Sequence, residues 1–100
     1  VATFGKKRCT RMTIIWTEYM RYRASLRGFD LAVIERILRN GAERYHDRST
    51  GRRVAVGRHG DGLVLVPFEQ EGEVITPVTV HATTRQQIQF RLNSGRFSHG

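Results

Sequence analysis

The chain has 100 residues, 39% of them hydrophobic, a formal net charge of +8 at pH 7 and a single cysteine. This length suits one domain with a core of its own, and the hydrophobic content is that of a folded protein. No apolar run approaches the roughly 18 residues of a membrane-spanning helix, and a single cysteine is typical of a cytoplasmic protein. One cysteine and four scattered histidines do not indicate a structural metal site, and no motif indicates a cofactor.

The positive charge is unevenly distributed along the chain. Lys6 and Lys7 are the only lysines among the 17 basic residues, so the other 15 are arginines. Residues 1–11 are basic and show no periodicity, which predicts a flexible basic arm ahead of a single domain over residues 12–97. Arginine is the better bidentate phosphate ligand, so the bias favours a polyanionic partner. Solvated helix faces would explain the same composition equally well.

The first half of the domain predicts an edge strand and two helices. Residues 13–16 form a short β-type run, and residues 17–27 predict a helix that ends at Gly28. Its buried stripe is expected to be Tyr19, Tyr22, Arg23 and Leu26. Asp30 is a predicted N-cap for a second helix that stops at Asn40-Gly41. Its buried face is expected to be Leu31, Ile34, Ile37 and Leu38. Residues 42–48 are ambiguous, with a further short strand as one interpretation.

The second half predicts a three-stranded meander over residues 52–81, with turns at Asp61-Gly62 and at residues 71–73. Pro67 and Pro77 lie inside predicted strands and require an edge position or a bulge; an edge is the simpler interpretation. Residues 84–87 fit a capping box for a final helix, and residues 98–100 are expected to fray. The predicted fold is α+β: an N-terminal helix pair on a small antiparallel sheet of three to five strands, with a short C-terminal helix.

Side-chain alternation in the last predicted strand separates two faces. One face, expected to lie under the helix pair, carries Val74, Thr76, Val78 and Val80, together with Val54 and Val56 of the first meander strand. The other face is expected to be partly open and to bring together Arg53, Thr79, His81 and Arg85. A histidine can move protons near neutral pH and arginines can hold phosphate, although a plain surface histidine is the commoner case. A bulge at Pro77 would reverse these faces.

Several short motifs carry a family resemblance. They are LRGF (residues 26–29), VAVGR (54–58), LVLVPF (63–68) and ITPVTVH (75–81), the last followed by Thr83-Thr84-Arg85. In this order the chain resembles, over about residues 13–92, small bacterial toxins of the BrnT kind within the wider RelE/ParE-like superfamily.

The resemblance implies a metal-independent endoribonuclease that acts on RNA, including ribosome-associated mRNA, and is neutralised by a cognate antitoxin protein. In such chemistry the 2′-hydroxyl of the RNA attacks the adjacent phosphate. The residues that match catalytic positions are His81 and Arg85. His81 falls where BrnT-like toxins carry an arginine. Basic residues expected to bind nucleic acid are Arg21, Arg27, Arg53 and Arg58.

The sequence departs from related domains in one further place. These domains usually carry a histidine early in the first helix, where this chain has Tyr19 and Met20. Two other readings therefore stay open. One is a non-catalytic module of the same fold that binds RNA, DNA or an acidic protein. The other is a domain that pairs into a homodimer through exposed strands.

Overall fold

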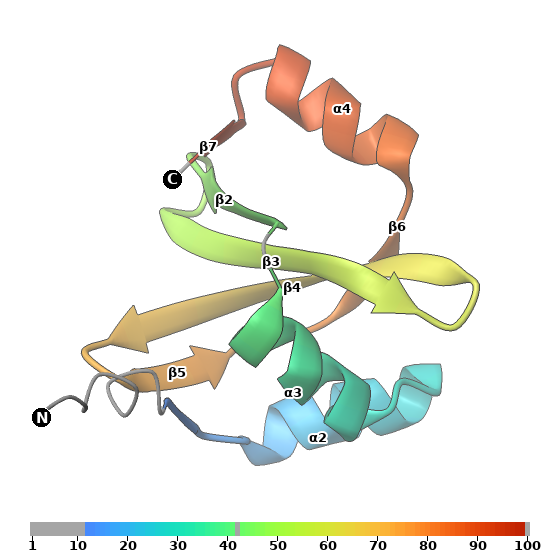
Figure 1. Cartoon of the computed structure of the whole chain (residues 1–100), viewed down its shortest axis with the longest axis vertical. Helices are drawn as coiled ribbons and strands as arrows, with labels where there is room; N and C mark the ends of the chain where they lie inside the picture. The colour runs from blue at the N-terminus through green and yellow to red at the C-terminus, as the bar shows by residue number, and fades with distance from the viewer. Residues whose placement is uncertain (1–11, 42, 100) are drawn as a thin grey trace, which may run out of the picture.

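The computed structural model describes residues 12–41 and 43–99, so the basic arm predicted for residues 1–11 lies outside the described residues. A twisted sheet carries α2 and α3 on one face and α4 on the other (Figure 1). Its seven strands run in the order β1-β5-β4-β3-β2-β7, and β6 pairs with β4 beyond the end of β5. The predicted α+β class is confirmed, with a larger sheet than the three to five strands expected.

The helices are α2 (Glu18–Arg27), α3 (Leu31–Asn40) and α4 (Arg85–Asn93). The strands are β1 (Thr13–Ile14), β2 (Glu43–Asp47), β3 (Arg52–His59), β4 (Gly62–Glu71), β5 (Val74–Pro77), β6 (His81–Thr83) and β7 (Phe97–His99). Neighbouring strands are antiparallel except β1 and β5, which are parallel. Because β7 pairs with β2, residues 98 and 99 belong to the sheet, and the expectation that they fray is wrong.

Local sequence signals set the helix boundaries. The side chains of Thr17, Asp30 and Thr84 each accept a hydrogen bond from a backbone N–H in the first turn of the helix that follows, at 3.1, 2.9 and 3.1 Å. These bonds satisfy donors that a helix start leaves without partners. Gly28 ends α2 with a φ of 75°, a left-handed conformation that glycine adopts without strain. The predicted caps at Gly28, Asp30 and Thr84 are therefore confirmed, whereas Thr17, expected inside the first helix, is its N-cap.

The larger core lies between the sheet and the helix pair α2 and α3. From the sheet it takes Ala55, Val64, Val66, Phe68, Ile75 and Val80, and from α3 it takes Ile34, Ile37 and Leu38. From α2 it takes Met20 and Ala24, so the stripe expected on that helix is wrong. Tyr19, Tyr22 and Leu26 are 56%, 60% and 63% exposed. Both stripes have helical spacing, and only docking on α3 and the sheet decides between them.

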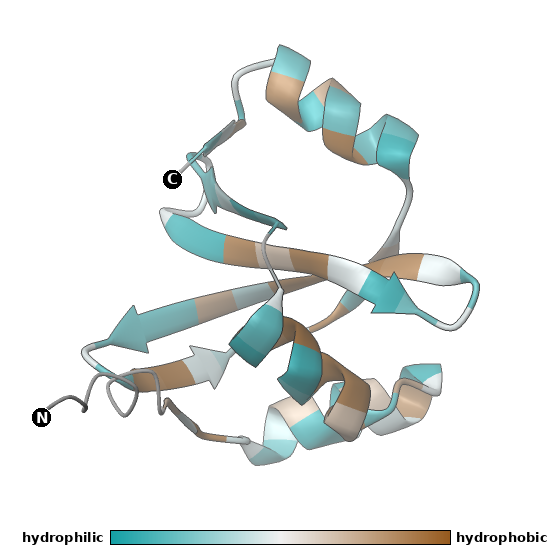
Figure 2. Ribbon diagram, viewed as in Figure 1, coloured by the Kyte–Doolittle hydropathy of each residue, from teal (hydrophilic) through white to brown (hydrophobic). Residues whose placement is uncertain are grey.

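A second core occupies the other face of the sheet, beneath α4 and beside β7. It consists of Tyr45, Val54, Val56, Leu65, Ile88 and Phe97. The middle of β3 is hydrophobic and its two ends are hydrophilic (Figure 2). Val54 and Val56 thus pack under α4, where they were expected to lie under the helix pair. The face expected to be partly open is covered in part by α4.

A β-bulge separates β5 from β6. Pro77 lies opposite Phe68 and His81 lies opposite Leu65, so three residues, 78–80, face only two, 66 and 67. The extra residue inverts the side-chain alternation. The Pro67 carbonyl accepts a hydrogen bond from Val78 N–H at 2.8 Å, so the missing N–H of Pro67 also faces the bulge. Pro67 is consequently tolerated in a central strand, and the expected edge position is wrong.

Candidate functional site

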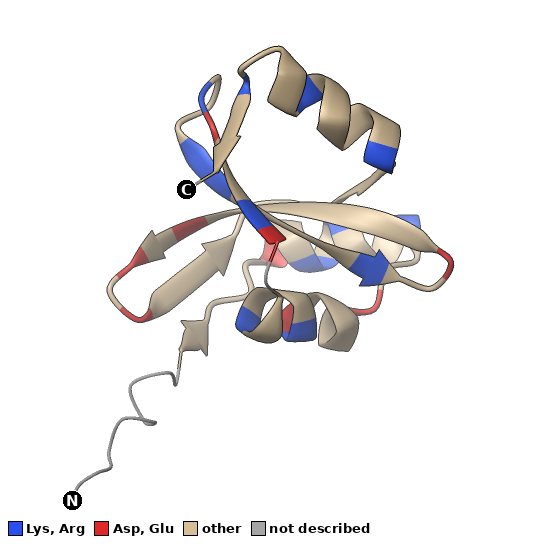
Figure 3. Cartoon of the chain, turned by 45° about the horizontal axis from the view of Figure 1, so that its top comes forward, with Lys and Arg blue, Asp and Glu red and all other residues tan. Residues whose placement is uncertain are grey.

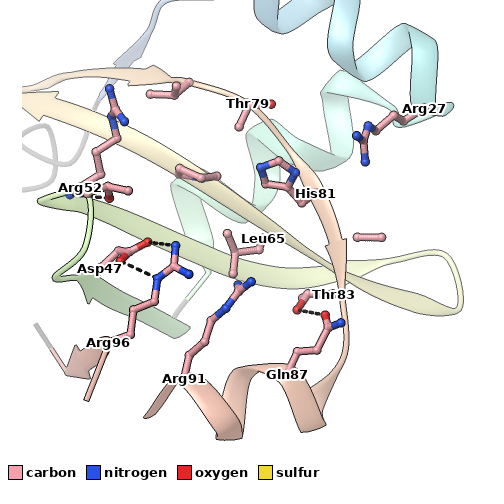
Figure 4. A pocket seen from close by; sticks show the side chains of 14 residues that line it. Arg27, Asp47, Arg52, Leu65, Thr79, His81, Thr83, Gln87, Arg91 and Arg96 are labelled. Atoms are coloured by element: carbon pink, nitrogen blue, oxygen red, sulfur yellow. Dashed lines mark hydrogen bonds and ion pairs between the residues drawn. The ribbon is translucent and has the colours of Figure 1, made fainter. Parts of the chain in front are cut away.

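A cavity of about 460 Å³ lies on the α4 face of the sheet. Leu65 of β4 forms part of its floor, and the bulge contributes Thr79. Gln87 and Arg91 of α4 line one side, while Arg27 reaches the cavity from the end of α2 (Figure 4). The cavity therefore gathers side chains from elements that are distant in sequence.

His81 projects into this cavity because the bulge turns it onto the same face as its partner, Leu65. Burial lowers the pKa of His81 below its ordinary value of 6.5, and the positive charges of Arg23, Arg27 and Arg91 lower the pKa further. Both causes disfavour the imidazolium form. The ring is consequently neutral near pH 7 and able to accept a proton.

The positive charge in the cavity is concentrated around His81. Among the described residues, neither Arg27 nor Arg91 forms an ion pair with a carboxylate. The guanidinium of Arg91 lies 5.5 Å from the centroid of the Phe97 ring, which helps to fix its position. Two guanidinium groups flanking a neutral imidazole form a suitable site for a phosphate group.

The far end of the cavity is neutralised by ion pairs. Arg96 donates two hydrogen bonds to the Asp47 carboxylate, at 3.0 and 3.1 Å, and Arg52 pairs with Glu69 at 3.2 Å. Burial by itself raises the pKa of Asp47, but the hydrogen bonds from Arg96 and Ser49 bring it down to about 2. Asp47 is therefore ionised at neutral pH and joins β2 to the segment before β7, and its role is structural.

Three polar side chains, those of Thr79, Thr83 and Gln87, also line the cavity. The Thr83 hydroxyl donates to the Gln87 side chain at 3.2 Å, which orients that amide. The Thr79 hydroxyl is buried and forms no hydrogen bond with any of the described residues. A buried hydroxyl without a partner costs free energy.

The other predicted site residues lie elsewhere. Arg85 donates to both carboxylate oxygens of Glu43, at 2.5 and 2.8 Å, and does not line the cavity. Arg53 lies opposite Phe68 and so faces the helix-pair side of the sheet. Arg58 borders a separate hollow beside α3, and Arg21 is exposed on α2. The expected convergence is therefore right for Thr79 and His81, and wrong for Arg53 and Arg85.

Arg91 and the pair of Asp47 and Arg96 were not among the site residues expected from the sequence. Arg91 follows Gln87 by four residues on α4, so helical spacing after the Thr84 cap places both on one face. That spacing was a usable signal. Asp47 and Arg96 are 49 residues apart, and no local pattern connects them.

Comparisons with known proteins identify no relative: no protein-family profile, curated protein or solved structure matches the chain. Within residues 12–41 and 43–99, no three His, Cys, Asp or Glu side chains are grouped so as to hold a metal ion. None of the helices described is long and apolar enough to cross a membrane.

Proposed function

We propose that this domain binds RNA in the cavity around His81 and cleaves it without a metal ion, as the resemblance to BrnT-like toxins implies. The observation that supports this most is the placement of a neutral imidazole between two arginines that lack carboxylate partners among the described residues. General bases work best when their pKa lies near the operating pH, and guanidinium groups stabilise the charge that develops on phosphate.

The proposed reaction is an internal transesterification. His81 accepts the proton of a 2′-hydroxyl, and the 2′-oxygen forms a bond to the adjacent phosphorus. The bond from phosphorus to the 5′-oxygen breaks, and the leaving oxygen takes a proton from water. The hydroxide that remains takes the proton back from His81. The products are a 2′,3′-cyclic phosphate and a 5′-hydroxyl end. Arg27 and Arg91 hold the non-bridging oxygens, while Asp47, with a pKa of about 2, cannot donate a proton at neutral pH.

A second candidate is an RNA-binding domain that does not cleave. The specific observation in its favour is Arg85, a position implied to be catalytic, which is held by Glu43 outside the cavity. The cavity also offers no evident proton donor for the leaving oxygen among its described side chains. The two candidates share the same binding surface and differ only in chemistry.

A cleavage assay separates the two candidates. Labelled single-stranded RNA is incubated with purified protein and EDTA, using wild type, His81→Asn, Arg91→Gln and the exposed control Arg36→Gln, which lines neither this cavity nor the one where β3, β2 and β7 adjoin. Cleavage is supported if cyclic phosphate ends form with wild type and the control but not with His81→Asn, while binding persists. Binding without cleavage, weakened in Arg91→Gln, supports the second candidate. Failure of wild type to bind RNA even at about 50 mM salt contradicts both.

The toxin role implied by the resemblance is part of the same proposal. A cognate antitoxin would neutralise the domain in the cytoplasm by covering the basic cavity. Induced expression should then arrest growth, and His81→Asn should relieve the arrest at equal protein level. Growth arrest that His81→Asn leaves unchanged would contradict a toxin based on this site.

A further inference from the structure

A second basic cavity, of about 310 Å³, lies where β3, β2 and β7 adjoin. His46 is paired with both Arg53 and Ser98, so these three side chains share one face of the sheet. Arg53 is opposite Phe68, a residue of the core beneath α2 and α3. The cavity is thus on the face opposite His81. Two arginines begin β3, whereas β2 carries one arginine between acidic residues at its two ends (Figure 3).

Arg44 fixes the inner wall of this cavity. Its guanidinium lies 5.3 Å from the centroid of the Phe68 ring and donates to the carbonyls of Leu38 and Gly41 at the end of α3. These contacts hold the side chain in one position. Arg44 and Arg53 line the same cavity. Burial lowers the pKa of Arg44, and the positive charge of Arg53 lowers it further.

No described carboxylate compensates this pair of charges. Arg53 donates to the side-chain oxygen of Gln70 at 3.3 Å, and neither Arg53 nor Arg44 takes part in an ion pair among the described residues. Arg44 is opposite Ala55 and Arg53 is opposite His46, so the two arginines are diagonal neighbours on adjacent strands, within reach of mutual repulsion. An anion that binds between them only in the folded state would stabilise the fold.

We propose that this second cavity binds a phosphate group. Arg44 and Arg53 supply the charge, and the imidazole of His46 and the hydroxyl of Ser98 supply further donors. A phosphate has several terminal oxygens that accept hydrogen bonds from different directions, which suits donors converging from β2, β3 and β7. The phosphate can come from free inorganic phosphate or from an RNA backbone. The proposal does not depend on cleavage at His81.

Thermal unfolding tests the proposal in sodium phosphate and in sodium chloride at matched ionic strength. All variants carry Arg91→Gln, which weakens phosphate binding in the cavity around His81: the Arg91→Gln parent, the parent with Arg53→Gln, and the parent with Arg36→Gln, a control on the exposed face of α3. Phosphate should raise the Tm of the parent and the control by about 4 °C or more beyond chloride. Addition of Arg53→Gln should remove that increment without a lower Tm in chloride, because it relieves repulsion. An increment that survives addition of Arg53→Gln, or no increment in the parent, overturns the proposal.

Amide NMR titration separates this cavity from the one around His81. Inorganic phosphate should shift the resonances of His46, Arg53 and Ser98 in wild type and in Arg91→Gln, but not in Arg53→Gln. Single-stranded RNA is added in a parallel titration; shifts at the same amides identify an RNA phosphate as the ligand, whereas shifts with inorganic phosphate alone identify a free phosphate. Absence of shifts at these three amides with both probes overturns the proposal, whatever happens at His81.

Discussion

Gly57 of β3 lies directly beneath Ile37 of α3. A Cβ atom on Gly57 would be 2.5 Å from Cγ1 of Ile37, with Cδ1 and Cγ2 at 2.8 and 2.9 Å. Real Cβ atoms do not approach carbon atoms so closely. The absence of a side chain at Gly57 therefore allows α3 to pack closely on the sheet, and this contact helps to place the helix pair.

Gly57→Ala should lower the free energy of unfolding by about 1–3 kcal/mol, because the added methyl group overpacks the core against Ile37. Chemical denaturation measures the change. Gly62→Ala is the matched control, since a Cβ there meets nothing within 4 Å. The double variant Gly57→Ala/Ile37→Ala removes the clashing side chain, so the two substitutions should not be additive. Equal stability of the two glycine variants would contradict the contact.

The buried carboxylate of Asp47 should make stability dependent on pH in acid. Its pKa is about 2 in the folded state against an ordinary value of 3.8. A lowered pKa contributes stability that is fully present above pH 3.8 and is lost as the pH falls towards 2, amounting to about 2 kcal/mol. Asp47→Asn should lower the free energy of unfolding by a similar amount at pH 7 and flatten its acid dependence. The exposed Asp61→Asn serves as control, and an unchanged acid slope in Asp47→Asn would argue against this role.

His81 should titrate below its ordinary pKa of 6.5, because burial and three neighbouring arginines disfavour the charged ring. The unfolded chain then binds a proton before the folded one does, so this group contributes stability above pH 6.5 that falls as the pH drops towards the folded pKa. NMR of the imidazole protons measures the value directly. Arg27→Gln and Arg91→Gln should each raise the pKa of His81, and no movement in either variant would show that the guanidinium groups are too distant to matter.

Arg91 should matter more than Arg85 for RNA binding. Arg85 is held by Glu43 through two hydrogen bonds, whereas Arg91 lines the cavity and has no carboxylate partner among the described residues. Arg91→Gln is expected to weaken RNA binding about tenfold and to reduce its salt dependence, as loss of one phosphate contact would. Arg85→Gln is expected to change affinity less than twofold. Fluorescence anisotropy measures both affinities. If Arg85→Gln weakens RNA binding more than Arg91→Gln does, Arg85 belongs to the binding site, as the family resemblance implies.

Truncation of the α2 tyrosines should be nearly neutral for stability. Tyr19 and Tyr22 are 56% and 60% exposed, whereas Met20 is fully buried. Tyr19→Ala and Tyr22→Ala should each change the free energy of unfolding by about 0.5 kcal/mol or less, and Met20→Ala should cost about 2–5 kcal/mol. Denaturant titration measures the three changes. A larger loss of stability for the tyrosine variants than for Met20→Ala would support the buried stripe that was expected from the sequence.

Much of the fold follows from local sequence. Helix ends depend on a few adjacent residues, and the Thr17, Asp30 and Thr84 caps each contact backbone within the next three residues. The meander likewise follows from β-branched runs and glycine turns. Its strands β3, β4 and β5 are consecutive in the chain, and each is antiparallel to the next. These interactions span short sequence distances, so a local pattern is sufficient to predict them.

The face of the sheet on which His81 lies depends on a single extra residue between β5 and β6. His81 faces the cavity because three residues of the bulge oppose two of β4, and no propensity rule fixes where such an extra residue is inserted. The same limit explains why Arg53 was expected beside His81 when it lies on the other face.

By itself the sequence determined the class of fold, the helix caps and the basic character of the chain, because each is set by composition or by neighbours within a few residues. Only the tertiary structure decided which stripe of α2 is buried, which arginines lie near His81, and that Arg44 and Arg53 line one cavity. Those arrangements arise from packing between segments far apart in the chain, where a single bulge or helix rotation changes every contact.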